Sequence, residues 1–166
     1  MDQEVIIRTA GPEDIATIQQ LAHQIWPVTY GHLMSADRLQ YMLQLIYSHD
    51  ALQNQMQQGH TFLLAMMDTT PVGFASFSAT GEQAVYKLQK IYIRTDIQGK
   101  GTGKRLINEV QDRIKKLNAS TLILNVKRDN PARWFYEKLG FVIIKEEDID
   151  IGNGYFMNDY VMEKKL

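Results

Sequence analysis

The segment that decides the fold is residues 98–104, which read Gln98-Gly99-Lys100-Gly101-Thr102-Gly103-Lys104. It follows a predicted strand at 84–93 and opens a predicted helix at 101–117. Three glycines within five residues let a ligand approach the backbone closely. The first amides of the following helix lack partners within the helix, and together with the helix dipole they favour an anion. The segment therefore predicts a phosphate-binding loop.

Two common phosphate-binding motifs do not fit this loop. A P-loop has Gly, four residues, and then Gly-Lys-Ser/Thr, but Gln98 and Arg105 occupy the first and last of these positions. A dinucleotide fingerprint, Gly-x-Gly-x-x-Gly, requires its third glycine at position 104 or 106, but these positions hold Lys104 and Leu106. What remains is Gln-x-x-Gly-x-Gly after a strand. From the loop alone, both a cofactor site and a glycine-rich turn without a ligand stay open.

The rest of the chain predicts an α+β fold with one mixed sheet. Turn signals at 68–71 and 152–154 indicate antiparallel hairpins, whereas the strand–helix–strand order around 101–117 indicates parallel pairing. Strands are expected at 4–9, 61–67, 72–78, 84–93, 121–126, 141–149 and 155–164. Further helices are expected after Gly11, after Ser35, over 50–58 and over 130–139.

The first helix is expected to end at Pro27, because proline disrupts a helix interior. The aromatic-rich segment 26–32 then becomes a connection between two helices. Such a connection either lines a pocket, where its rings make cation–π contacts to an ammonium, or is a packed loop.

Composition limits the classes of protein. The chain has 166 residues, a formal net charge of −1, 45% hydrophobic residues and no cysteine. One domain over 1–166 is expected. The charge excludes a bulk nucleic-acid binder, and the missing cysteine excludes disulfides, thiolate zinc sites and a cysteine nucleophile. No signal or membrane segment is recognised, so we expect a cytoplasmic protein with no membrane partner and no metal.

A second motif occupies residues 130–141, Asn-Pro-Ala-Arg-Trp-Phe-Tyr-Glu-Lys-Leu-Gly-Phe. With the Gln98-x-x-Gly101-x-Gly103 loop, it resembles the two signatures of the GNAT superfamily, the Gcn5-related N-acetyltransferases. The order of predicted elements over the whole chain also fits. The resemblance implies a three-layer fold in which a mostly antiparallel sheet of about seven strands has helices on both faces. It also implies that strands four and five splay apart.

The resemblance implies that acetyl-CoA lies in this splayed gap. The pantetheine arm would pair with strand backbone, and loop amides would hold the pyrophosphate. Tyr136 matches the family's general acid; apart from the motif, it would be a core aromatic between Phe135 and Leu139. The residues implied for cofactor binding are Ile91, Tyr92, Ile93, Gln98, Gly99, Lys100, Gly101, Thr102, Gly103, Lys104, Asn130 and Ala132.

The general base is left open. An alkyl ammonium of pKa near 10.4 is neutral in about 1 molecule in 2,500 at pH 7, equivalent to about 4.6 kcal/mol. Many relatives carry a Glu on the fourth strand, but Gln89 stands at that position and cannot accept a proton. Other candidates, none supported by spacing, are Glu82, His23, His32, Asp159 and solvent.

Charge and the C-terminal sequence suggest the acceptor. Residues 87–133 carry 12 basic and 4 acidic residues, a formal charge of +8, which leaves −9 on the remainder. Glu146, Glu147, Asp148, Asp150 and Asp159 either form an acidic wall for a cation or lie on a solvated hairpin. The tail 152–166 is similar to that of PaiA-like bacterial members, which acetylate polyamines.

These observations predict an N-acetyltransferase that transfers the acetyl group of acetyl-CoA directly to a small primary amine such as spermidine or spermine. The alternatives are a non-catalytic acyl-CoA sensor and an acetyltransferase of a protein N-terminus or an amino acid. Whether the protein is a homodimer is left open.

Overall fold

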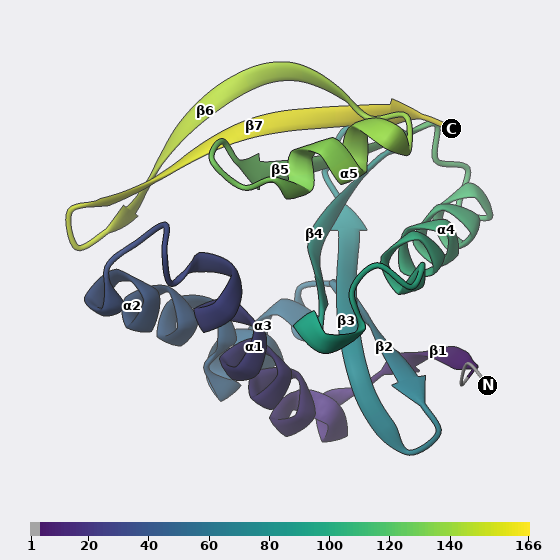
Figure 1. Ribbon diagram of the computed structural model, residues 1–166. Coiled ribbons are helices and arrows are strands. Elements are labelled where there is room, and N and C mark those ends of the chain that lie inside the picture. The colour runs from purple at the N-terminus through teal and green to yellow at the C-terminus, as the bar shows by residue number, and fades with distance from the viewer. Residues whose placement is uncertain (1–3) are drawn as a thin grey trace.

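The computed structural model describes residues 4–166. Their strands form one mixed sheet (Figure 1). Within these residues the spatial strand order is β1-β2-β3-β4-β5-β7-β6, and only β4 and β5 pair in parallel. The expected mixed, mostly antiparallel sheet of about seven strands is confirmed. The strands are β1 (Val5–Ala10), β2 (Thr61–Met67), β3 (Thr70–Ala79), β4 (Val85–Ile93), β5 (Thr121–Lys127), β6 (Val142–Gly152) and β7 (Tyr155–Lys165).

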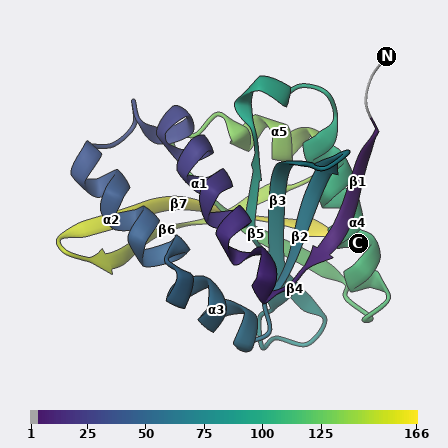
Figure 2. The same cartoon turned by 90° about the horizontal axis from the view of Figure 1, so that it is seen from below.

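Helices cover both faces of the sheet (Figure 2). Along β2, Phe62 and Leu64 face one apolar cluster and Leu63 and Ala65 face the other, because successive strand residues alternate between faces. The first cluster is covered by α1 (Ile15–Tyr30), α2 (Ala36–Tyr47) and α3 (His49–Gln57). The second is covered by α4 (Thr102–Lys115) and α5 (Ala132–Lys138). Short 3-10 turns, η1 (Pro12–Asp14) and η2 (Thr95–Ile97), precede α1 and α4.

The expected end of the first helix at Pro27 is wrong, because α1 continues to Tyr30 with Pro27 inside it. An interior proline costs a helix about 3 kcal/mol. Trp26 and Tyr30 are only 4% and 7% exposed, and burying a large apolar side chain is worth about 1.5–3 kcal/mol. Tertiary packing of these two rings therefore outweighs the local preference, and the aromatic segment becomes the last turn of a helix rather than a loop.

The pairing between β4 and β5 is short. It joins Val85 to Thr121 and ends where Leu88 faces Leu124. Beyond this point β4 stays paired with β3 as far as Ile93, while β5 stays paired with β7. The sheet therefore opens between its two central strands, as expected.

The β6–β7 hairpin arches from the sheet to the helix layer (Figure 1). At its tip the Tyr41 hydroxyl of α2 donates to the Ile151 carbonyl. The Arg38 guanidinium of α2 donates to the Phe156 carbonyl and lies 5.9 Å from the centroid of the Tyr155 ring. The hairpin thus bridges the second half of the sheet and α2.

Candidate active site

The gap exposes one edge of β4 in the middle of the sheet. Residues 91–93 pair with Ala75, Phe74 and Gly73 of β3 on one side, but the β4–β5 ladder has already ended on the other. A strand backbone carries a donor and an acceptor at every residue except proline. The free edge of β4 can therefore bind an extended chain that has amide groups of its own.

The glycine loop lies directly beyond this edge. Gly99 and Gly101 have φ of +86° and +84°, conformations that side chains rarely adopt, and Gly101 is the N-cap of α4. Among the described residues, the first α4 amide to donate to a backbone carbonyl is that of Arg105, which bonds Gly101. The amides that precede it at the helix N-terminus are thus available to an anion.

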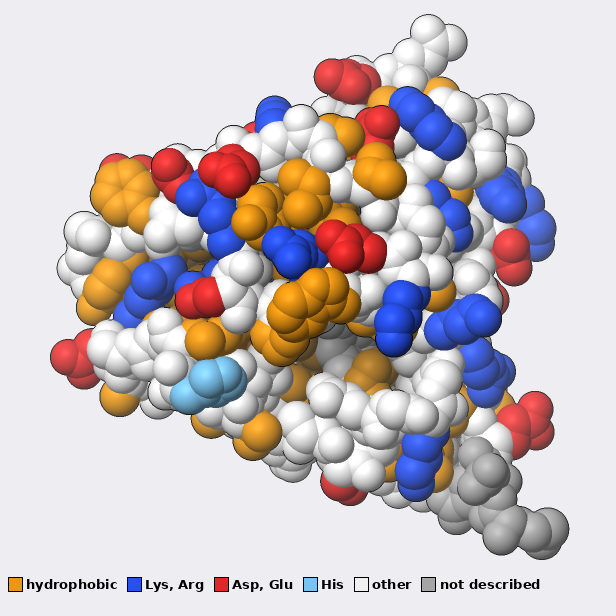
Figure 3. Space-filling model, turned by 45° about the horizontal axis from the view of Figure 1, so that its top comes forward, with side chains coloured by type: hydrophobic (Ala, Val, Ile, Leu, Met, Phe, Trp, Pro, Cys, Tyr) orange, Lys and Arg blue, Asp and Glu red, His pale blue; other side chains and the backbone are white. Residues whose placement is uncertain are grey.

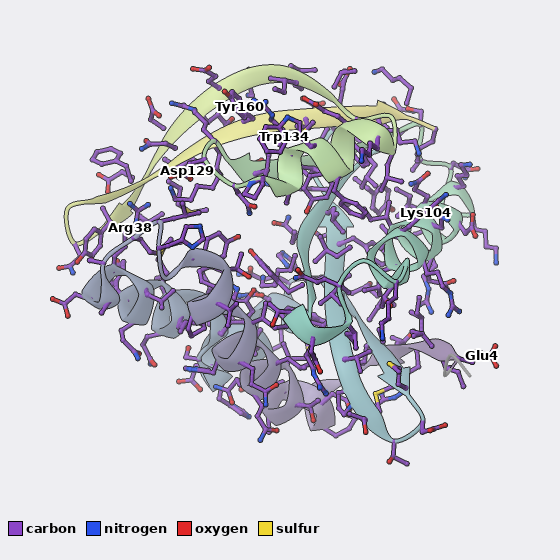
Figure 4. The ribbon with its side chains drawn as sticks, in the orientation of Figure 1. Glu4, Arg38, Lys104, Asp129, Trp134 and Tyr160 are labelled. Atoms are coloured by element: carbon purple, nitrogen blue, oxygen red, sulfur yellow. The ribbon has the colours of Figure 1, made fainter. Side chains whose placement is uncertain are left out.

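Side chains around the loop divide into two groups. The Gln98 amide donates to the Ile93 carbonyl at 3.1 Å, and Thr102 is buried, so both hold the loop against the end of β4 and α4. Lys100 and Lys104 are exposed, and Lys104 projects from α4 (Figure 4). The surface is hollowed near the centre of Figure 3, with lysine and arginine side chains along one side. Arg105 instead borders a separate hollow between β1 and α4.

The second sequence motif forms the opposite side of the gap. The side-chain Oδ1 of Asn130 accepts from the Ala132 backbone amide at 2.9 Å at the start of α5. Tyr136 is 8% exposed and packs edge-on against Phe141, with 5.9 Å between ring centroids. Gly103 lets α4 approach this helix, because a Cβ there would lie 3.2 Å from the Phe135 ring. The predicted donor-side residues are therefore gathered around one opening.

Three tyrosines meet at the gap from different elements. The hydroxyls of Tyr30 (α1) and Tyr92 (β4) are 2.8 Å apart, and the Asn130 amide donates to Tyr30 at 3.4 Å. Burial, with a smaller effect of Tyr30, raises the pKa of Tyr136 well above that of a free phenol. Tyr136 is thus protonated at neutral pH, as a general acid requires. The sequence places Tyr30 in an aromatic connection that either lines a pocket or packs, and it does not predict the contact with β4; the i, i+4 spacing of Trp26 and Tyr30 is a helical signal.

The candidate bases differ sharply in position. The Gln89 amide donates to the Ser78 hydroxyl at 3.0 Å, which ties it to β3. Glu82, His23 and His32 are exposed. Asp159 is only 2% exposed and accepts a hydrogen bond from Asn125, the first β5 residue beyond the β4–β5 ladder. Of the named side chains, Asp159 alone is a buried carboxylate beside the gap.

The five acidic residues of the C-terminal hairpin do not form one wall. Glu146 and Asp148 lie on the α5 face and reach Arg128 at 3.9 and 2.7 Å. Asp150 accepts from the Gly152 amide in the hairpin turn. Glu147 and Asp159 share the other face, where Asn125 donates to both.

The described part of the chain contains no cluster of three or more His, Asp or Glu side chains placed to hold a metal ion. Within residues 4–166, moreover, no helix combines the length and the apolar character needed to cross a bilayer.

Comparison with known proteins agrees with this geometry. The family model for the acetyltransferase (GNAT) domain matches residues 33–164. A spermidine N(1)-acetyltransferase of Thermoplasma acidophilum is 30% identical over 96% of this chain and 96% of its own length. A [ribosomal protein bS18]-alanine N-acetyltransferase of Haemophilus influenzae is 30% identical over 66% of this chain and 70% of its own.

A solved structure is also similar. The PaiA N-acetyltransferase of Thermoplasma acidophilum, crystallised in complex with coenzyme A, superposes with a TM-score of 0.83 at 28% identity and covers 98% of this chain and 99% of its own. The family model spans well over half of the sequence, and the matched range includes the glycine loop and α5. This chain therefore belongs to the GNAT family and is an acetyltransferase.

Proposed function

We propose that the protein transfers the acetyl group of acetyl-CoA to a primary amine of a small polyamine. The free β4 edge supports the donor half of this proposal most directly, because an extended pantetheine arm carries amides that complement strand backbone. The loop at 98–104 supplies helix N-terminal amides and two exposed lysines for the pyrophosphate. A related protein was crystallised in complex with coenzyme A, which supports acetyl-CoA as the donor.

The reaction proceeds by direct attack of the neutral amine on the thioester carbonyl. The carbon–nitrogen bond forms, the carbon–sulfur bond breaks, and the leaving sulfur takes a proton from Tyr136. Backbone amides of β4 near Ile91 and Tyr92 would stabilise the negative charge that develops on the carbonyl oxygen.

The acceptor proposal rests on similarity and charge. The relative that matches nearly the full chain is a spermidine N(1)-acetyltransferase. Glu147 and Asp159 lie on one face of the β6–β7 hairpin beside the gap, where they suit a cationic amine. An N-terminal alanine is the second candidate, because a bS18-alanine N-acetyltransferase matches two thirds of the chain.

The experiment is an acceptor panel. Purified protein is incubated with acetyl-CoA and spermidine, spermine, free amino acids or an alanine-terminated peptide, and free thiol and acetylated amine are measured. Polyamines should give turnover with equal amounts of thiol and N-acetylated product. Turnover with the peptide or amino acids but not polyamines contradicts the polyamine proposal. Binding of acetyl-CoA without any transfer indicates a sensor. The cytoplasmic location stays a prediction, and whether the protein is a homodimer stays open.

A further inference from the structure

Asp159 is a buried carboxylate of β7 that faces the interior of the arch. Its neighbour Tyr160 contacts Arg133 on the α5 face, at 5.4 Å from the ring centroid, so by strand alternation Asp159 points to the opposite face. There its Oδ2 accepts from the Asn125 amide at 3.2 Å. Asn125 directly follows the last β5 residue that pairs with β4. Asp159 therefore lies where the sheet opens.

The carboxylate has no ion-pair partner within 4.0 Å among residues 4–166. Lys127, its partner across the β5–β7 ladder, binds Asp129 at 2.6 Å instead. The Arg128 guanidinium binds Asp148, and at Asp159 it donates to the backbone carbonyl rather than to the carboxylate. An ionised carboxylate buried without a cation is unfavourable, so this position is suited to a cation that arrives with a ligand.

Asp159 also acts on the aromatic cluster in the gap. Its negative charge contributes to raising the pKa of Tyr30, after burial of that phenol. The Tyr30 hydroxyl bonds Tyr92 of β4 and Asn130. Tyr30 thus feels the charge of Asp159 and also bonds Tyr92 and Asn130, which belong to the proposed acetyl site.

The electrostatics agree with a proton acceptor. Burial raises the pKa of Asp159, and the Glu147 carboxylate on β6 adds to this; the hydrogen bond from Asn125 and the charges of Lys87 on β4 and Arg128 oppose it. A carboxylate whose pKa lies above its usual range is a better base towards an ammonium.

We propose that Asp159 binds the ammonium of the acceptor amine and takes one proton from it, so that a neutral amine attacks the thioester. This inference rests on the proposed function. The proton taken by Asp159 passes to solvent. The nitrogen loses a second proton as the amide forms, which balances the proton that Tyr136 gives to the sulfur and then regains.

Asp159→Asn tests the inference directly. With spermidine and acetyl-CoA at pH 7, we expect kcat/KM for the amine to fall about 100-fold or more. The KM for acetyl-CoA should be unchanged, and Asp159→Glu should recover part of the rate. The defect should shrink as pH approaches the amine pKa near 10.4, because neutral amine then comes from solution. A purely structural role predicts a defect that does not depend on pH.

Glu163→Gln is the matched control. Glu163 lies on the same strand and face as Asp159, four residues and roughly 13 Å along β7. The change to Gln removes the same negative charge as Asp159→Asn does. This control should retain wild-type kinetics. Activity of Asp159→Asn within twofold of Glu163→Gln overturns the inference alone. Wild-type protein that acetylates no amine overturns the proposed function and this inference with it.

A second measurement needs no variant. In the wild type, binding of the ammonium by an ionised Asp159 predicts that kcat/KM for spermidine is level between about pH 7 and 9. If solvent alone removes the proton, kcat/KM instead rises about tenfold per pH unit towards the amine pKa, and the inference is wrong.

Discussion

The proposed role of Tyr136 as general acid requires a phenol that stays protonated and yet gives its proton to sulfur. Burial secures the first condition by raising the pKa of Tyr136, but it also makes the phenol a weaker acid. The same burial disfavours the leaving thiolate, whose pKa rises for the same reason. Because donor and acceptor shift in the same direction, proton transfer between them remains feasible inside the gap.

Tyr136→Phe should remove this proton while keeping the ring that packs on Phe141. We expect kcat to fall about 100-fold or more, with little change in the thermal unfolding midpoint or in coenzyme A affinity. Steady-state kinetics and calorimetric titration with coenzyme A measure these quantities. Tyr160→Phe on β7 is the control. It keeps its ring against Arg133 of α5 and should be fully active. Unchanged turnover in Tyr136→Phe would rule out the phenol as the acid.

The N-terminus of α4 combines a left-handed glycine cap with open space. A side chain at Gly101 would meet no atom within 4 Å, so nothing but the backbone conformation disfavours one there. The left-handed conformation costs a residue with a Cβ about 1–2 kcal/mol. In a variant with a side chain at position 101, the backbone relieves this strain by moving, and the amides that would face the pyrophosphate move with it.

Gly101→Ala should therefore have two effects. We expect the free energy of unfolding to fall by about 1–2 kcal/mol and the KM for acetyl-CoA to rise several-fold, with kcat changed less. Gly59→Ala is the control, because Gly59 has φ of +96° and open space at the end of α3, remote in sequence from the loop. It should lose similar stability without a change in KM. An equal KM effect in both variants would show that strain acts globally.

At the scale of the whole molecule, the ammonium of one lysine is buried between the sheet and the helices that cover it. Lys90 of β4 is 9% exposed, and its ammonium donates to the side-chain Oε1 of Gln55 on α3 at 2.7 Å. The ammonium also lies over the rings of Tyr47 and Phe62. Burial, with a smaller contribution from Lys87, lowers the pKa of Lys90 to about 8. The unfolded chain keeps the ordinary value of 10.5, so between these values it binds one proton more than the folded protein.

Folding stability should therefore rise with pH through this window. Below about pH 8 the full penalty of burying the ammonium applies, and it disappears between pH 8 and 10.5. We expect the free energy of unfolding of wild type, relative to Lys90→Met, to increase by about 3 kcal/mol across this range. Urea denaturation of both proteins at several pH values measures the difference. A constant difference would show that Lys90 has the same pKa in the folded and the unfolded chain, so that its burial does not shift its titration.

Much of the arrangement could be predicted from the sequence, because its signals are local. Gly101 and Gly103 lie at the cap and in the first turn of the helix that follows β4, and the motif around Tyr136 forms the helix expected there. The hairpins also follow their turn signals. Each of these depends on a few neighbouring residues.

The remaining features depend on residues far apart in the chain. Pro27 stays helical only because Trp26 and Tyr30 are buried against the sheet. The contact of Tyr30 with Tyr92 joins residues 62 positions apart. Asp159 is buried, unlike the exposed Glu82, only because β5, β6 and β7 pair around it. Single-sequence patterns contain no information on such pairings.

The β4–β5 opening has a consequence for aggregation. An unpaired strand edge normally invites a strand of another molecule, and sheets are most vulnerable at their outer strands. Here the unpaired stretch of β4 lies inside the sheet, with β3 on one side and the β5–β7 ladder beyond the gap on the other. An intruding strand would need to thread between these elements. The protein can thus keep an unsatisfied edge ready for a narrow ligand without offering it as a template for self-association.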